Sequence, residues 1–400
     1  MTTLTVRQVL AEKRFFRIWM GQLVSILGDF VALFAVQVAV VFRLHATARE
    51  TTGVMVAFLA PPVLIGPVAG VFVDRWNPRR IMIASDFLRG VLVLFLGFAT
   101  NLAEIYGVCF ALSCVSSFFL PAQSVTLPLL VGREGLMAAN SLMQQTIQLV
   151  RIFSPVVASA LAVWFGEAAC YYADSVTFFF SAAMIASLTY DRPVDPAARG
   201  FGAVLSELRQ GVRFVFTHPA HSYVILSMTA GLFAITCFSS LAPVFVRDVL
   251  HAGAYLFGTM GSLIGLGSIA GAAAAMKLRR GLAPHMVSVG VSGIGLSIML
   301  LAAVRNGPAT LICSFAIGVS AAIIMMASTA LLQGQTPPQM RGRVNSSAMA
   351  MIAMAQTVAL LSAGSWAERF GTINLFYASA AMLFAVAFAC ATSSCRFMMP

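Results

Sequence analysis

Charged side chains are scarce in this sequence of 400 residues. Only 10% of the residues are Asp, Glu, Lys or Arg, and Lys13 and Lys277 are the only lysines. A soluble domain carries about 25% charged residues, and disordered chains are more polar still, so both classes are excluded. Hydrophobic residues make up 60% of the chain, and its mean hydropathy is +0.90. At about 20 apolar residues per crossing, this composition predicts a membrane protein of around twelve spans.

Motifs of several enzyme and binding classes are also missing. Neither lysine follows a glycine, so the chain has no P-loop and ATP is not expected as its energy source. The sequence holds no H-E-x-x-H or G-x-S-x-G motif, and its five histidines form no ligand cluster. The net charge of +11 is not gathered on a helix face or beside an RNA-type aromatic motif. We therefore expect no enzyme, no cofactor, no metal site and no nucleic-acid partner.

The seven cysteines are odd in number and scattered, with no pair at metal or redox spacing. Most lie inside apolar runs, which predicts buried packing residues. The apolar stretch after Lys13, Arg14 and Arg17 is too long for a signal peptide and has no small-residue cleavage site, so we expect no cleaved leader.

The apolar runs predict an all-α, polytopic fold with two groups of six spans. The predicted spans are 16–42, 51–73, 81–99, 104–126, 138–165 and 168–190, then 221–246, 254–276, 284–304, 308–332, 344–366 and 371–393. We divide the chain into a bundle over 1–190, a linker over 191–219 and a second bundle over 220–400. Within the linker, apolar residues recur at helical spacing over 201–216, which predicts an amphipathic helix on the cytoplasmic membrane face.

The distribution of arginine and lysine tests this layout. With the N-terminus in the cytoplasm, most basic residues fall in cytoplasmic segments, and only Arg43, Arg49, Arg247, Arg305 and Arg369 fall in outer loops. Cytoplasmic loops are enriched in basic residues, so the sequence predicts that both termini are cytoplasmic.

The two halves share short features at nearly constant offsets. Asn140-Ser141 opens the fifth predicted span and Asn345-Ser346 the eleventh, and we expect both pairs to act as helix N-caps. A glycine, Gly70 or Gly271, also precedes a basic turn in each half. Such repetition predicts a duplicated six-helix unit.

The stretch from Gly70 to Arg80 carries the sharpest motif. A glycine permits close helix approach, Asp74 is placed to face a helix dipole or an arginine, and Arg75, Arg79 and Arg80 anchor the loop in the cytoplasm. This G-x-x-x-D-R-x-x-R-R pattern between the second and third spans resembles that of the major facilitator superfamily, whose six-plus-six layout covers essentially the whole chain. The alternative is a loop that is merely basic and sets topology.

The resemblance implies a conformational latch on the outward-facing state, formed by Gly70, Asp74, Arg75, Arg79 and Arg80. The corresponding stretch of the second half has Ala275 in place of Asp74, so its copy would lack the carboxylate.

Finer stretches look like the branch that contains enterobactin exporters and macrolide-efflux proteins. These are Gly21–Asp29, Ala84–Arg89, Ala138–Leu142 and the loop Met340–Asn345, with Arg341, Gly342 and Arg343. The resemblance implies export of a bulky compound by proton antiport. The antiporter motif of the fifth span is altered, because Ser154-Pro155 stands in place of Gly-Pro, although small residues for close packing are retained.

Charges inside a span are costly unless they are paired or hydrated, and all five lie in the first half: Asp29, Asp86, Arg89, Arg151 and Asp174. Asp29 is about 18 Å from the cytoplasmic edge at the helical rise, near the middle of a core about 30 Å thick. Gln22 and Ser25 share its helix face, and Gln144, Gln148 and Arg151 share one face of the fifth span. We expect these two polar faces to meet in a water-accessible cavity.

The sequence thus predicts an interaction of Asp29 with Arg151, either as a proton-coupling pair or as a structural buried pair. We expect Asp86 and Arg89, three residues apart on the third span, to brace the latch loop. Asp174 lies near the outer edge and is open to more than one role, including contact with water.

We therefore expect a secondary transporter of the bacterial inner membrane, a monomer that uses protons to export a hydrophobic or amphipathic small molecule through a cavity between its halves. Membrane lipids and the substrate are its expected partners. The alternatives are an uptake symporter for a nutrient or siderophore and a lipid translocator. Because the second half has no charge well inside its spans, the sequence favours export of a largely apolar compound.

Overall fold

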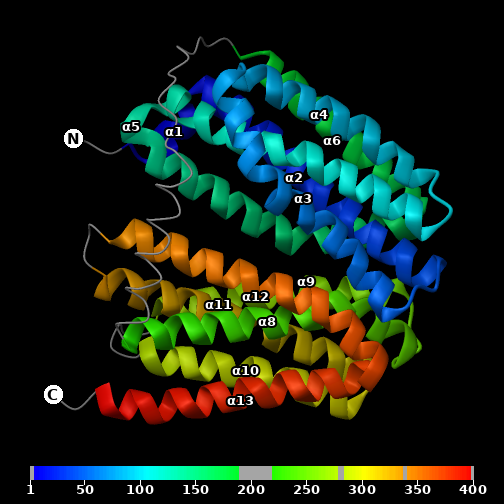
Figure 1. Ribbon diagram of the computed structural model, residues 1–400, viewed down its shortest axis with the longest axis vertical. Coiled ribbons are helices and arrows are strands. Elements are labelled where there is room, and N and C mark those ends of the chain that lie inside the picture. Colours follow the sequence, from blue (N-terminus) through cyan, green and yellow to red (C-terminus); the bar gives the residue numbers. More distant parts are fainter. Residues whose placement is uncertain (1–3, 189–218, 278–282, 337–339, 398–400) are drawn as a thin grey trace. The chain divides into compact units, whose positions relative to one another are not determined.

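The computed structural model describes residues 4–188, 219–277, 283–336 and 340–397, and within these ranges it is helical with no strand (Figure 1). The linker and its predicted amphipathic helix lie outside the described residues, apart from the last residue of the linker. The helices run as α1 Val6–Ala11, α2 Lys13–Val38, α3 Ala48–Arg75, α4 Pro78–Leu94, α5 Leu102–Phe165, α6 Glu167–Ala186, α8 Pro219–Asp248, α9 Ala254–Lys277, α10 Ala283–Val304, α11 Gly307–Gln335, α12 Arg341–Phe370 and α13 Thr372–Phe397.

Ten helices in the described ranges are long and apolar enough to cross a membrane. All twelve predicted spans coincide with helical segments. The two that are not among the ten correspond to α4, which has 17 residues, and to the second part of α5. The all-helical, polytopic fold class predicted from the apolar runs is confirmed.

Contacts divide the chain into two compact units. One comprises residues 1–45 and 54–198, and the other comprises residues 46–53 and 199–400. The first unit holds α1, α2, α4, α5, α6 and most of α3, and the second holds α8 to α13.

Local sequence explains where α4 begins. The Asn77 side chain accepts hydrogen bonds from the backbone N–H groups of Arg79 and Arg80, at 3.0 and 3.4 Å, and Pro78 occupies the first helical position. An Asn cap followed by Pro satisfies the free donors of a helix N-terminus. The Asn-Pro-Arg-Arg part of the loop motif is therefore a helix start as well as a basic turn.

The fourth and fifth predicted spans form one element, α5, which is broken at Gly132. This glycine adopts φ 64° and ψ 179°, a left-handed backbone conformation that glycine tolerates without steric cost. The break lies between the two predicted spans, so the chain changes direction with almost no connecting loop.

Two local expectations are corrected. Asn140 lies well inside α5, and Asn345 lies four residues beyond the start of α12, whose N-cap is Met340, so neither caps a helix. Both helical segments begin earlier than the apolar pattern indicates because the polar residues that precede the apolar runs are also helical. Helix α1, which a capping box of Thr5 and Gln8 starts, was not among the predicted elements.

Small residues let helices approach closely inside each unit. In the first, α2 packs on α6, and a Cβ on Gly21 would lie 3.3 Å from the Ser181 Cα. In the second, Gly267 and Gly271 of α9 face the α11 backbone at Phe315 and Val319. Membrane helices associate through such contacts because lipid offers no hydrophobic driving force between them.

Candidate functional site

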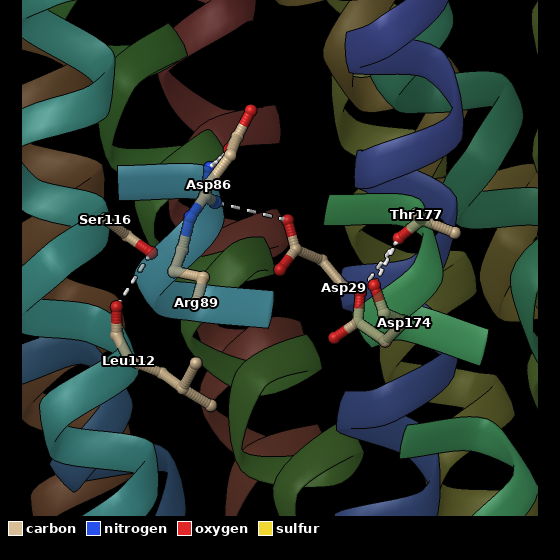
Figure 2. Close-up of polar contacts among 7 residues, drawn as sticks. All are labelled: Asp29, Asp86, Arg89, Leu112, Ser116, Asp174 and Thr177. Carbon is tan, nitrogen blue, oxygen red and sulfur yellow. Dashed lines mark hydrogen bonds and ion pairs between the residues drawn. The ribbon is translucent and has the colours of Figure 1, made fainter. Parts of the chain in front are cut away.

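Four charged side chains from three helices gather inside the first unit (Figure 2). Asp29 comes from α2, Asp86 and Arg89 from α4, and Asp174 from α6. We call these four residues the charge cluster. None of these helices carries another charged side chain along this stretch, so the cluster is the charged centre of a packed helix group.

Arg89 is the only cation of the charge cluster and contacts two of its carboxylates. Its guanidinium is paired with the Asp86 carboxylate, and its Nη1 lies 3.9 Å from Asp29 Oδ2. The same guanidinium lies over the rings of Phe119 and Phe178, at 4.7 and 4.4 Å from their centroids. Cation–π contacts of this kind are stronger when they are desolvated, so Arg89 is held firmly from several sides.

The two acidic partners of Arg89 differ in accessibility. The Asp86 side chain is 0% exposed, whereas that of Asp29 is 37% exposed. Asp29 borders a cavity of about 30 Å³ that Arg89, Asp174 and Ser116 also line. The Ser116 hydroxyl donates to the Leu112 carbonyl at 2.9 Å. A volume of about 10–15 Å³ holds one water, so this cavity has room for water beside the Asp29 carboxylate.

The third carboxylate of the charge cluster, Asp174 on α6, is buried. It is 2% exposed, and its Oδ1 accepts a hydrogen bond from the Thr177 hydroxyl at 3.2 Å. Gly28, beside Asp29 on α2, packs directly on it, since a Cβ at Gly28 would lie only 3.1 Å from the Asp174 Cα. The absence of a side chain at Gly28 thus brings the Asp29 and Asp174 backbones together.

The charge cluster is not neutral when it is fully ionised. It contains three carboxylates and a single guanidinium, in a region where an uncompensated charge is expensive. Protons or other cations would restore the balance. Chemically, the arrangement is suited to binding and releasing a proton.

The expected polar faces are only partly described. Gln22 and Ser25 are buried, at 5% and 2% exposed, and they do not line the cavity that Asp29 borders. Gln144 is exposed on α5, and the side chains of Gln148 and Arg151 lie outside the described residues. The Asp29–Arg151 interaction therefore stays a prediction, while the ion pair that the structure describes for Asp29 is with Arg89.

The structure also describes the surroundings of only some of the predicted latch residues. The Arg79 guanidinium donates to the carbonyls of Ile185, at 3.4 Å, and Ala186 at the end of α6, where a cation complements the helix dipole. Arg80 is exposed. The side chains of Asp74 and Arg75 and the surroundings of Gly70 are outside the described set, so the bracing of this loop by Asp86 and Arg89 also stays a prediction.

The remaining predicted residues lie on helices. Ser154 is buried and Pro155 lies within α5. The first turn of α12 contains Arg341, Gly342 and Arg343, whose side chains are not among the described ones. Among the described cysteines, Cys109, Cys170, Cys237 and Cys313 are buried, as predicted, and Cys114 is partly exposed. Over the described ranges, no group of His, Cys, Asp and Glu could hold a metal ion.

A family model described as Major Facilitator Superfamily matches residues 18–355. Among curated proteins, the chain is similar to the macrolide efflux protein A of Streptococcus pyogenes, with 25% identity over 94% of this chain and 95% of that one. It is also similar to the enterobactin exporter EntS of Salmonella choleraesuis, with 26% identity over 82% and 79%. An uncharacterized MFS-type transporter of Bacillus subtilis, YfiS, is 24% identical over 91% and 89%.

Solved structures agree on the fold. A mutant of the nucleoside transporter NupG superposes with a TM-score of 0.72 at 11% identity, covering 95% of this chain and 99% of that one. A bacterial homologue of the lysosomal transporter Spinster gives a TM-score of 0.67 at 10% identity, over 95% and 98%.

Proposed function

Because the chain belongs to the Major Facilitator Superfamily, and is therefore a membrane transporter and not an enzyme, we propose that it exports a bulky hydrophobic or amphipathic small molecule in exchange for protons. The observation that carries the coupling is the charge cluster. A partly exposed carboxylate beside a water-sized cavity, facing a guanidinium shared with a sealed carboxylate, is a site that can take up and release a proton.

In this proposal Asp29 is the coupling carboxylate. Protonation removes its charge and with it the attraction to Arg89, whose Nη1 is 3.9 Å away. Because Asp86 and two aromatic rings keep Arg89 in place, loss of this attraction frees α2 more than α4. A change in the relative position of α2 would then link protonation to alternating access, which in this fold is largely rigid-body rocking. Arg151 would modulate the charge of Asp29 from α5.

Two features support the direction and the kind of substrate. Two of the similar proteins are named for efflux or export. In the described part of the second unit, the charged residues stand at or near helix ends, among them Arg247, Asp248, Arg305, Glu368 and Arg369. A permanently charged substrate would need a counter-charge inside the spans, so we propose a largely apolar compound.

The other predicted residues take supporting roles in this proposal. Gly70, Asp74, Arg75, Arg79 and Arg80 would form the latch that holds one state of the cycle. Gln22, Ser25, Gln144 and Gln148 would line part of the substrate path, and Ser154 with Pro155 would shape the packing of α5. Arg341, Gly342 and Arg343 would be the second-half counterpart of the loop.

Transport in inverted membrane vesicles tests the function. Vesicles from cells that produce the protein should accumulate a macrolide or an uncharged fluorescent hydrophobic compound when respiration acidifies their interior. A protonophore should abolish the accumulation. The control is vesicles that hold the same amount of the Asp29→Asn variant. Accumulation that persists in protonophore, or a failure of the wild-type vesicles to accumulate either compound, would contradict a proton-coupled exporter. Accumulation that equals the control would instead reject Asp29 as the coupling group.

We also propose that the protein lies in the bacterial inner membrane with both termini cytoplasmic. A cysteine placed within 191–219, in a background free of the native cysteines, should react with an impermeant maleimide in inverted vesicles and not in intact spheroplasts. The control is a cysteine at Arg305, which the same topology places outside and which should show the opposite pattern. Labelling of the 191–219 cysteine from outside would overturn the orientation.

A further inference from the structure

A second cavity lies on the first unit, away from the charge cluster. It has a volume of about 550 Å³ and runs between α4 and α5 beneath the turn that joins α3 to α4. Its walls are mainly apolar, with Ile81, Ala84 and Leu88 on α4 and Val115 and Phe118 on α5, while Arg80 and Asn77 lie at one end. We call it the α4–α5 groove. Asp29, Arg89 and Asp174 do not line it.

The length and openness of the groove match one leaflet of a bilayer. From Asn77 to Leu88 along α4 the helical rise gives about 16 Å, close to half of a hydrocarbon core about 30 Å thick. Trp76, Ala84 and Leu88 are exposed, so the groove is open along its side. An acyl chain running parallel to α4 would fill a space of this shape.

An interfacial tryptophan marks the polar end of the groove. The Trp76 ring lies 5.0 Å from that of Phe72, which lies 6.5 Å from Phe118 on α5. Trp side chains gather at the boundary between hydrocarbon and water, so this aromatic row sets the mouth of the groove at headgroup level. In the orientation proposed above, that level belongs to the cytoplasmic leaflet.

The charge at this end favours an anion. Arg79 and Arg80 follow each other, but the Arg79 guanidinium is engaged with the α6 carbonyls, whereas Arg80 lines the groove. The described part of the chain gives the Arg80 guanidinium no ion pair. The mouth also stands at the N-terminus of α4, whose dipole attracts negative charge.

We propose that the α4–α5 groove binds an anionic phospholipid, with one acyl chain along α4 and the phosphate at Arg80. Basic pockets between spans on the cytoplasmic side are suited to such headgroups. One arginine near the surface contributes a preference of about fivefold for an anionic lipid over a zwitterionic one.

Quenching of Trp76 fluorescence by lipids with brominated acyl chains tests the proposal. The full-length protein is reconstituted in phosphatidylcholine vesicles in which either phosphatidylglycerol or a fraction of the phosphatidylcholine is brominated, at equal content. The difference between wild type and Trp76→Phe isolates the Trp76 signal from the other tryptophans. We expect phosphatidylglycerol to occupy the groove about five times more readily than phosphatidylcholine.

Two variants separate the headgroup contact from the acyl contact. Arg80→Gln should bring the lipid preference close to one, while Arg14→Gln, which removes another exposed arginine of the same predicted membrane side, should leave it unchanged. Ala84→Phe fills the exposed wall of the groove and should reduce quenching by both lipids.

Equal quenching by the two lipids in the wild type, or a preference that survives Arg80→Gln, would overturn the proposal. Relief of quenching by micromolar amounts of an amphipathic organic cation would assign the groove to a substrate instead. Relief by glycerol phosphate would assign it to a soluble phosphate compound.

Discussion

Asp29→Asn is expected to abolish substrate accumulation driven by a proton gradient while the protein still binds substrate. The amide has almost the shape of the carboxylate but cannot take up a proton in the physiological range. Because the Asp29–Arg89 distance is long, at 3.9 Å, and Arg89 keeps Asp86 and two rings, the helices should stay packed. We expect a fall in gradient-driven transport of at least about tenfold, as for the loss of an essential proton-transfer group.

The measurement is uptake into proteoliposomes after a pH jump, together with substrate binding to the purified protein. Asp29→Glu retains a titratable group and should recover part of the transport. Glu134→Gln removes an exposed carboxylate outside the charge cluster and should transport like the wild type. If Asp29→Asn keeps a normal response to the gradient, Asp29 is not the coupling group. Asp174 would then be tested next, because it borders the same cavity whereas Asp86 is sealed.

The helices were predictable because their signals are local. Apolar runs of membrane length require helices, since an isolated segment in lipid must satisfy its own backbone groups. The Asn-Pro start of α4 and the glycine break of α5 likewise each depend on only a few neighbouring residues. The errors have the same origin: a polar pair such as Asn140-Ser141 looks like a cap whether the helix begins there or earlier in the chain.

The members of the charge cluster could also be predicted, because a charged residue inside an apolar run is easily recognised in a sequence. Which of them form ion pairs could not be predicted. The spacing of Asp86 and Arg89 predicts that they face the same way, but Arg89 reaches Asp29 because α2, α4 and α6 pack together. Gly28 permits the close approach of α2 and α6, and nothing in a single sequence tells which helix fills the space beside a given glycine.

Periodicity also did not separate the residues of one helix face. Gln22, Ser25 and Asp29 share a face of α2, yet only Asp29 borders the cavity, while the other two are buried. The helical repeat tells which way a side chain points. Whether a cavity opens beside that side chain depends on the side chains of the neighbouring helices, which the repeat does not contain. Residues that share a helix face by spacing alone therefore need not border the same cavity.

Arg89→Met is the second variant with a large expected effect, and it acts on stability. It leaves the Asp86 carboxylate, which is 0% exposed, without its guanidinium. Removing one partner of a buried ion pair costs about 3–5 kcal/mol, and we expect the melting temperature of the purified protein to fall by roughly 10 °C. Thermal unfolding monitored by the loss of monodisperse protein on size-exclusion chromatography measures this change.

The double variant Asp86→Leu/Arg89→Met distinguishes a lost ion pair from a lost helix contact. It removes both charges together, and replacement of a buried pair by apolar residues of similar size is often neutral for stability. We expect the melting temperature to return to within a few degrees of wild type, so the two substitutions should be strongly non-additive. Arg43→Met is the matched control, because its ion pair with Glu167 is partly exposed and should contribute at most about 1 kcal/mol. If the double variant is less stable than Arg89→Met alone, the Asp86–Arg89 ion pair is not what holds this part of the bundle together.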